Sequence, residues 1–416
     1  ESIEGLDTEY RNTDGPLKLS RTENGNILSK IYLEAAAEAG YEINNDMNGY
    51  KQEGFGLMDT TIFDGKRQST SVTYLHPIKQ RQNLTLITNI QVSKIIIENS
   101  SAIGVEIKNK NKLKKIFAEK EVLLSAGAIN SPQILMLSGV GPEEELKNHG
   151  INVISALNGV GENLQDHLET YVQYECTKPV TLYSSFNPIN MALIGMQWFL
   201  FKKGIAAHSN LEIGGFIRTN EMVDYPNMQY HFFPSLVIDH GRQNPSCHAF
   251  QAHVGPMRPT SRGFVKLKSS NPIDSPRIQF NYMQTEHDLN EMREGIKIAR
   301  NIFHQKAFDH YRGKEISPGE NINSDDGLNN FIRSKGDTAY HPSCTCKMGN
   351  DDMSVVDQNL KVYGVEKLRV VDASIMPNIV SGNLNATTVM IAEKASDLIQ
   401  NKITAEKVNI EFYKAS

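Results

Sequence analysis

The sequence predicts a fold that combines α/β units with a lobe built on a mixed sheet, in the α+β and α/β classes. Apolar strands run into small-residue turns and then into helices near residues 122–137 and 368–400. Residues 168–335 instead mix alternating strands with amphipathic helices. The length of 416 residues is enough for two ordinary domains or one large two-part enzyme.

The composition is that of a globular protein and argues against nucleic acid as a partner. Hydrophobic residues make up 39% and charged residues 22% of the chain, and the net charge of -5 leaves no basic footprint. One short lysine cluster lies between strand-like runs, which predicts the solvated end of a hairpin. Its members are Lys110, Lys112, Lys114 and Lys115.

The first third of the chain begins with a helix and continues in β-structure. Residues 27–39 are amphipathic, and Asn26 and Gly40 provide the start and stop signals. Four apolar, β-rich runs follow, with a turn at residues 99–101. These runs cover residues 84–87, 94–97, 103–107 and 122–125.

Two capped helices are predicted directly after the last of these strands. The turn at residues 126–128 is made of small residues, which let a ligand approach the backbone closely. Asn130 or Ser131 is expected to cap the first helix, with Pro132 in its first turn. The second helix has Pro142 at its first position, acidic residues 143–145 in its first turn and Gly150 at its end.

The middle of the chain predicts strands at residues 228–233 and 263–268 and a helix after Thr285. Asp288 completes a capping box with Thr285. The apolar positions of this helix recur at helical spacing, at Leu289, Met292, Ile296 and Ala299. The aromatic residues Tyr174, Phe232 and Phe233 are expected in the core rather than in a binding pocket.

The longest apolar stretch runs from Ile189 to Phe201 and predicts a buried core helix. Asn187 and Pro188 precede it, and Gly204 follows it, as at helix ends. The stretch is too short to span a bilayer. Peripheral membrane contact is the weaker alternative, so no membrane partner is expected.

A second strand–turn–helix unit closes the chain. Residues 368–371 form an apolar strand, residues 372–374 a turn and residues 381–383 a polar elbow. A helix is predicted over residues 387–400. Its inward positions are expected to be Met390, Ile391, Ala395 and Leu398.

Two blocks of sequence resemble the glucose-methanol-choline (GMC) family of flavin oxidoreductases. Residues 127–141 read GAINSPQILMLSGVG, which is similar to the family's second signature and continues through residues 159–167. Residues 341–349 and 368–386 resemble its C-terminal catalytic block. The animal glucose-dehydrogenase-like branch is the nearest by this resemblance.

The resemblance implies a division of the chain into three segments. Residues 1–167 and 336–416 are expected to form the FAD-binding domain, the latter carrying the catalytic block. Residues 168–335 are expected to form the substrate-binding domain.

The resemblance also implies a chemistry, the oxidation of an alcohol or sugar hydroxyl by hydride transfer to FAD. His341 matches the family's catalytic histidine, whose pKa near neutrality suits a general base. Asn383 matches its partner position and is expected to orient the alcohol, because an amide takes no proton at neutral pH.

Four residues are implied to contact the cofactor. The backbone of Asn385 and Ala386, at a helix start, would stabilise the negative charge of reduced flavin. Ala373 is expected near the flavin chain, and Val92 matches a position whose backbone meets the adenine in family members.

The sequence contains no G-x-G-x-x-G segment after a strand. The resemblance therefore leads to the expectation that the chain is truncated and lacks the family's N-terminal nucleotide-binding segment. A competing hypothesis is a non-catalytic remnant that cannot hold FAD tightly. A metal site at His341, Cys344 and Cys346 is disfavoured by the ligand spacing, so no metal is expected.

The sequence leaves the remaining partners open. Quinone or oxygen could accept the electrons, and a dehydrogenase is favoured over an oxidase. No charged cluster in the middle segment predicts a choline-like substrate. Four other histidines are expected at the surface or at helix caps, namely His76, His149, His167 and His287. Glycosylation-type tripeptides at residues 83–85 and 99–101 lean weakly towards secretion.

Overall fold

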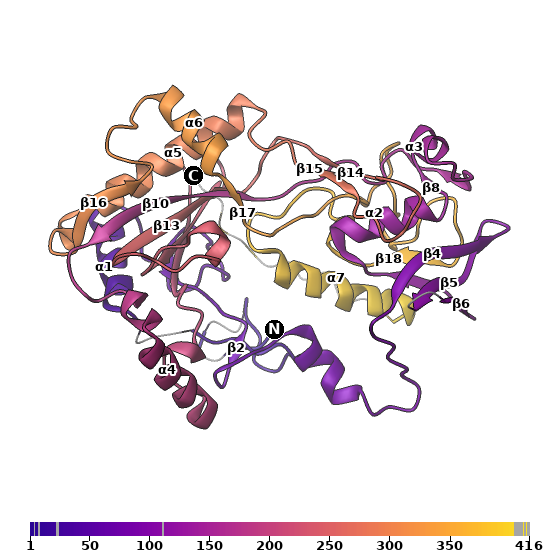
Figure 1. Cartoon of the computed structure of the whole chain (residues 1–416), viewed down its shortest axis with the longest axis horizontal. Helices are drawn as coiled ribbons and strands as arrows, with labels where there is room; N and C mark the ends of the chain where they lie inside the picture. The colour runs from indigo at the N-terminus through magenta and orange to yellow at the C-terminus, as the bar shows by residue number, and fades with distance from the viewer. Residues whose placement is uncertain are drawn as a thin grey trace.

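The computed structural model describes residues 1–3, 5–6, 9–21, 25–109, 112–402, 411 and 413. Figure 1 shows two lobes along the long axis of the molecule, with a large sheet at one end and a set of small sheets at the other. Helix α7 (Leu384–Ile399) lies between them, beneath the connecting segments.

A seven-stranded sheet forms the first lobe. All of its pairings are antiparallel, where the sequence predicted a mixed sheet, because alternating strands do not by themselves reveal their relative direction. In spatial order the strands are β1 (Gly54–Leu57), β11 (Ile213–Ile217), β12 (Met228–Phe233), β13 (Ala249–Pro256), β10 (Leu168–Cys176) and β16 (Arg312–Ser317), with β17 (Asp337–Thr338) also paired to β10.

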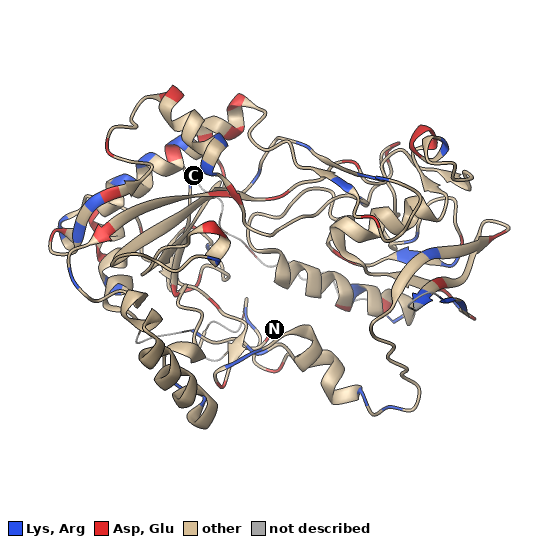
Figure 2. Ribbon diagram, viewed as in Figure 1, with Lys and Arg blue, Asp and Glu red and all other residues tan. Residues whose placement is uncertain are grey.

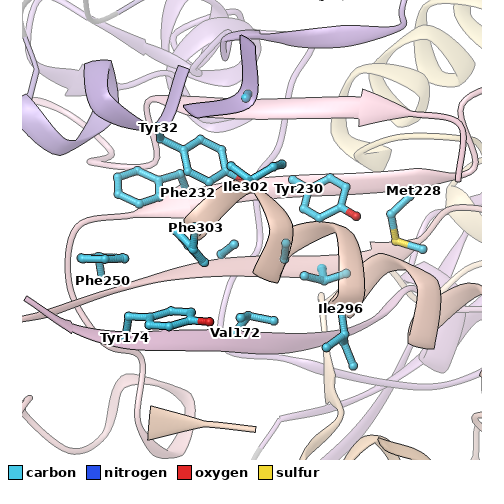
Figure 3. Packing of buried hydrophobic residues seen from close by; sticks show 14 of the residues in the cluster. Tyr32, Val172, Tyr174, Met228, Tyr230, Phe232, Phe250, Ile296, Ile302 and Phe303 are labelled. Atoms are coloured by element: carbon cyan, nitrogen blue, oxygen red, sulfur yellow. The ribbon is translucent and has the colours of Figure 1, made fainter. Parts of the chain in front are cut away.

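Three helices belong to this lobe, α1 (Ile27–Glu38), α5 (Glu286–Phe303) and α6 (Asp325–Lys335). The predicted N-caps are confirmed: the side chains of Asn26 and Thr285 accept hydrogen bonds from the first turns of α1 and α5. The other half of the predicted capping box was wrong, because the Asp288 carboxylate accepts from Thr260 and Ser261 instead. Figure 3 shows the core between α5, α1 and the sheet, where Tyr32 stacks on Phe232 at a centroid distance of 4.7 Å. Tyr174 and Phe232 are therefore core residues, as predicted.

The second lobe contains the two predicted strand–turn–helix units. Strand β7 (Val122–Leu124) leads to α2 (Gly127–Leu137), and β18 (Leu368–Val370) pairs with β7 in parallel. A three-stranded antiparallel sheet packs nearby, consisting of β4 (Gln91–Glu98), β5 (Ser101–Asn109) and β6 (Lys112–Phe117). The side chains of Lys112, Lys114 and Lys115 are exposed on β6, whereas Lys110 lies outside the described residues.

Short elements connect these parts. The strands are β2 (Ile62–Phe63), β3 (Lys66–Arg67), β8 (Val140–Gly141), β9 (Ser155–Ala156), β14 (Phe264–Lys266) and β15 (Arg277–Gln279). The helical elements are α3 (Glu143–Asn148), η1 (Ser71–Leu75), η2 (His76–Ile78), η3 (Leu182–Phe186), η4 (Ile205–Ala207), η5 (Asp239–Gly241), η6 (Lys306–Phe308) and η7 (Ala373–Ile375).

Several local predictions were wrong. Residues 84–87 form no strand, and Leu86 is 60% exposed because no neighbouring strand pairs with this run. Helix α2 begins at Gly127 rather than after Asn130. The reason is a distant partner: Asp372 accepts hydrogen bonds from the Gly127 amide and the Ser131 hydroxyl.

The last helix also differs from its prediction. It begins three positions earlier than expected, directly after Asn383. Ile391 and Ala395 are buried as predicted, but Met390 is exposed.

The apolar stretch at residues 188–201 forms a helix with the predicted ends but not the predicted burial. Helix α4 (Pro188–Phe201) is capped by the Asn187 side chain, which accepts a hydrogen bond from Ile189. No residue of α4 is buried, so the prediction of a core helix was wrong. Over the described part of the chain, no helix combines the length and the apolar character needed to cross a bilayer.

Candidate active site

Two connected hollows lie between the large sheet and the start of α7. The smaller, of about 190 Å³, is lined by His167, Leu168, Glu169, Leu211, Gln229, His231, His253, Gly255, Met257, Ala339, Tyr340, His341 and Asn383. A larger and more open cavity of about 1070 Å³ shares Leu211, His231 and Asn383 with it. The smaller pocket therefore opens onto the larger cavity at these shared residues.

His341 lies at the end of the short loop that follows β17. Pairing of β17 with the start of β10 brings this loop against the large sheet. Asp166 then holds the loop: one oxygen accepts the backbone N–H of His341 at 2.8 Å, and the other accepts the Thr338 hydroxyl at 2.6 Å. These contacts fix the backbone at the position that the sequence assigns to the base.

His167 determines which ring nitrogen of His341 carries the proton. Nε2 of His167 lies 3.0 Å from the carbonyl oxygen of Met257, which only accepts, so this nitrogen must donate. Burial lowers the pKa of His167 to about 3, so its ring is neutral and its Nδ1 carries a lone pair. That Nδ1 lies 3.0 Å from Nδ1 of His341, which must therefore be the protonated nitrogen. The lone pair of His341 is consequently on Nε2, on the side of Asn383.

Asn383 is oriented by a second chain of hydrogen bonds. The Gln229 amide nitrogen donates to Oδ1 of Asn383 at 2.9 Å. Nδ2 of Asn383 consequently points towards Nε2 of His341, at 3.3 Å. The Asn383 amide thus donates directly to the lone pair of His341 Nε2. An alcohol oxygen placed beside this pair would be within reach of both the ring nitrogen and the amide donor.

The structure brings together some predicted site residues and adds others. His341 and Asn383 are neighbours although 42 positions separate them in the sequence. His76, His149 and His287 lie at the surface or at helix caps as predicted, but His167 is 1% exposed and contacts His341. This burial was not predicted, because His167 lies just before β10, outside the strand pattern that would have indicated a buried position.

Glu169 is the second site residue that the sequence did not reveal. Its carboxylate accepts hydrogen bonds from His253 at 2.9 Å and from Tyr171 at 3.1 Å. Burial would raise the pKa of Glu169, but the interactions with His253, His231 and Tyr171 outweigh it and lower the pKa. Among the residues that the structure describes, no Lys or Arg lines this pocket. Glu169 therefore brings a negative charge into the pocket without a permanent cationic partner.

The ring of His253 is held by hydrogen bonds at both of its nitrogens. The amide oxygen of Gln251 accepts from Gln173 and from the backbone of Val237, so its amide nitrogen must face Nε2 of His253, at 2.8 Å. Nε2 then accepts, and Nδ1 is the nitrogen that donates to Glu169. The carboxylate of Glu169 is thus hydrogen-bonded to a histidine ring and to a tyrosine hydroxyl.

Comparison with known proteins decides the family. Two family models described as GMC oxidoreductase match residues 2–169 and 259–392. The chain belongs to the GMC oxidoreductase family. It is 51% identical to human mitochondrial choline dehydrogenase over 98% of this chain and 69% of that protein. It is also 49% identical to the oxygen-dependent choline dehydrogenase of Acinetobacter baumannii, over 98% of this chain and 75% of the relative.

Solved structures of GMC proteins share the fold. An FAD-dependent oxidoreductase from Chaetomium thermophilum aligns with a TM-score of 0.85 and 26% identity, covering 95% of this chain and 75% of that one. The predicted fold class, a GMC-type FAD-binding part with a substrate domain, is confirmed. The exact division into residues 1–167, 168–335 and 336–416 stays a prediction.

Two finer expectations find no support. The relatives described above are choline dehydrogenases rather than members of a glucose-dehydrogenase-like branch. Signature motifs are common to the whole family, so they do not reveal the branch. The comparisons do not support the expected absence of an N-terminal segment either.

This GMC oxidoreductase is an FAD-dependent enzyme that oxidises alcohol CH–OH groups, and the reading as a non-catalytic remnant is not favoured. The residues at the start of α7 fit the cofactor. Asn385, Ala386 and Thr387 line the larger cavity, and Asn383 forms no side-chain capping bond to the helix. A helix N-terminus left open in this way suits an anionic acceptor such as the pyrimidine edge of reduced flavin.

The other two predicted cofactor contacts have different surroundings. Ala373 begins η7, next to Asp372, and its carbonyl accepts a hydrogen bond from Cys344. Val92 pairs with Ile107 between β4 and β5 and lines neither of the two hollows. The roles of Ala373, Val92, Asn385 and Ala386 towards FAD stay predictions.

Burial of His167 predicts an acid-labile fold. Its folded pKa of about 3 lies below the ordinary value of 6.5, so protonation favours the unfolded state as pH falls below 6.5. Between pH 7 and pH 5 the free energy of unfolding should fall by about 2 kcal/mol, at roughly 1.4 kcal/mol per pH unit below 6.5. Chemical denaturation at both pH values should show that His167→Asn loses less stability on acidification than the wild type. Equal losses in both proteins would contradict the assignment.

Proposed function

We propose that the substrate is choline or a similarly small alcohol with a quaternary ammonium group. The observation that carries this proposal is Glu169, a carboxylate without a Lys or Arg partner in the pocket that also holds His341 and Asn383. The names of the relatives, human choline dehydrogenase among them, agree with it. This replaces the expectation that no charge would point to a choline-like cation.

The pocket can bind the cationic end of such a molecule by charge and by aromatic contact. The side chain of Glu169 is 15% exposed, so the interaction of a cation with it is poorly screened by water. Rings of Tyr340, His231 and His253 line the same pocket. Aromatic faces attract quaternary ammonium groups, which form no hydrogen bonds of their own.

The hydroxyl end of the substrate would lie at His341 and Asn383. Nε2 of His341 takes the hydroxyl proton, and Nδ2 of Asn383 donates to the same oxygen and fixes its position. When bound, FAD accepts the hydride that leaves the carbinol carbon. His167 keeps the accepting lone pair on Nε2, and Gln229 keeps the Asn383 donor facing it.

The substrate proposal is tested by comparing choline with its neutral isostere 3,3-dimethylbutan-1-ol. In Glu169→Gln, kcat/KM for choline should fall roughly 30-fold, because a buried charge pair contributes about 2 kcal/mol. The neutral alcohol should be affected by less than about threefold, because it has no charge to lose. Steady-state rates on both substrates give the comparison.

Matched controls separate charge from structure. Glu145→Gln removes a carboxylate on α3 and should leave both substrates unchanged. Flavin content and thermal stability of each variant show whether the pocket is intact. Equal losses for both alcohols in Glu169→Gln, or no loss for choline, would reject the cation site.

A further inference from the structure

Helix α4 exposes an unusual amount of apolar surface. Seven of its large apolar side chains are more than half exposed: Ile189, Met191, Leu193, Met196, Phe199, Leu200 and Phe201. Phe199 reaches 72% exposure, although it is among the least water-soluble of side chains. A contiguous surface of this kind marks an interaction site rather than a random feature.

Within the part of the chain that the structure describes, one stripe of α4 is less exposed than the rest of the helix and contacts the body of the protein. Ile194 and Trp198 are its less exposed apolar residues, one helical turn apart. The Trp198 indole N–H donates to the carbonyl of Gly65, in the turn between β2 and β3, at 2.7 Å. The helix is therefore tied to the body at this point while most of its circumference stays open. Figure 1 shows α4 projecting from the edge of the sheet lobe.

The surroundings of α4 are basic. Lys202 and Lys203 follow the helix directly, and the adjacent hairpin exposes Lys66 and Arg67 beside a single acidic residue, Asp64. The sequence contains no Asp or Glu from residue 177 to residue 211. Figure 2 accordingly shows no acidic residue along α4.

We propose that α4 docks this protein on the surface of an anionic phospholipid bilayer. The apolar side chains would enter the acyl region, and the four basic residues would contact lipid headgroups. Fourteen residues give a helix of about 21 Å, which can lie in one leaflet but does not cross a bilayer.

Two features favour lipid over a protein partner. A protein groove covers one stripe of a helix, whereas the apolar residues of α4 surround most of it. Trp198 and the two lysines also lie together at one end, the arrangement in which aromatic rings and lysines meet the membrane interface. The proposal is independent of the substrate, since neither Phe199 nor Leu200 lines the catalytic pocket.

Sedimentation of the FAD-loaded protein with vesicles tests the proposal. The wild type should bind vesicles of phosphatidylethanolamine and phosphatidylglycerol. Phe199→Ser/Leu200→Ser should weaken this binding at least about tenfold, because each side chain loses its transfer into the acyl region. Lys202→Gln/Lys203→Gln should weaken it about fivefold per lysine, and less at high salt.

A matched control replaces two exposed apolar side chains on another element of the protein. Leu113 and Phe117, on β6, are 63% and 65% exposed, so Leu113→Ser/Phe117→Ser removes similar surface far from α4 in the sequence. This variant should bind vesicles as the wild type does. The α4 variants should keep the wild-type kcat on soluble alcohol.

Two outcomes would overturn the proposal. One is a wild type that does not bind the anionic vesicles, or a control pair that reduces binding as much as the α4 pair. The other is a dimer in sedimentation velocity that Phe199→Ser/Leu200→Ser dissociates while vesicle binding is unchanged. That result would make α4 a contact between two copies of the chain.

Discussion

In the FAD-loaded protein, His341→Ala is expected to slow flavin reduction by the alcohol substrate roughly 10²-fold or more. The reason is that Nε2 of His341 carries the lone pair that faces Asn383, and the variant leaves no base at this place. Flavin binding should persist, because the cofactor contacts proposed at the start of α7 come from backbone groups. Rapid mixing without oxygen, followed at the flavin absorbance, measures the rate.

The pH dependence of the same reaction checks the assignment. Burial lowers the pKa of His341 below its ordinary value of 6.5, against the raising effects of Asp166 and Glu169. The neutral, proton-accepting ring is therefore present at neutral pH, and kcat/KM should fall only as pH drops below 6.5. His341→Ala should lack this acid limb. Exposed His76 offers a control, since His76→Ala should change neither rate nor profile.

Asn383→Ala is expected to be milder than His341→Ala, because it removes a hydrogen bond to the substrate and not the proton acceptor. An unchanged rate of flavin reduction in His341→Ala would show that His341 is not the base. A harsher effect of the asparagine change would reverse the two roles.

The sequence predicted the elements whose signals are local. The start of α4 was correct because Asn187 and Pro188 act within the first turn of the helix. The helix ends before Gly204 as predicted, but the residue that caps its end is Lys202, in the left-handed conformation. Its burial was wrong because apolar composition says what a helix would bury, not whether another element covers it. The strand predicted at residues 84–87 is absent for a similar reason, since a β-rich run forms a strand only where a second strand pairs with it.

The catalytic pair was predicted through motif resemblance, whereas the rest of the pocket depends on tertiary contacts. Glu169 lies on β10, where alternate residues are less buried than their neighbours, and this face carries the polar side chains of the pocket. This alternation could be recognised in the sequence, but no sequence signal indicates that His231 and His253 line the same pocket. The proposed site for the substrate cation was therefore missed, although Glu169 lies in a strand with a regular alternation.

Replacing His167 by leucine should have the second-largest effect, a loss of about 10²-fold in kcat/KM. The variant removes the acceptor that holds the proton on Nδ1 of His341. The ring could then place its proton on Nε2, which would present a donor to the alcohol instead of a base. In a serine protease, loss of the group that fixes the tautomer of the catalytic histidine costs about 10⁴-fold, so 10²-fold is a moderate expectation.

His167→Asn provides the matched comparison. The side-chain oxygen of asparagine can take the place of Nδ1 and still accept from His341, so most of the activity should remain. A purely structural role predicts the opposite order, because leucine suits a buried site better than an unpaired amide does. The pH profile adds a second distinction: a positioning role predicts a changed acid limb in His167→Leu, since the proton of His341 is no longer held on Nδ1. Leucine and asparagine variants of equal activity would show that the tautomer of His341 is fixed by other contacts.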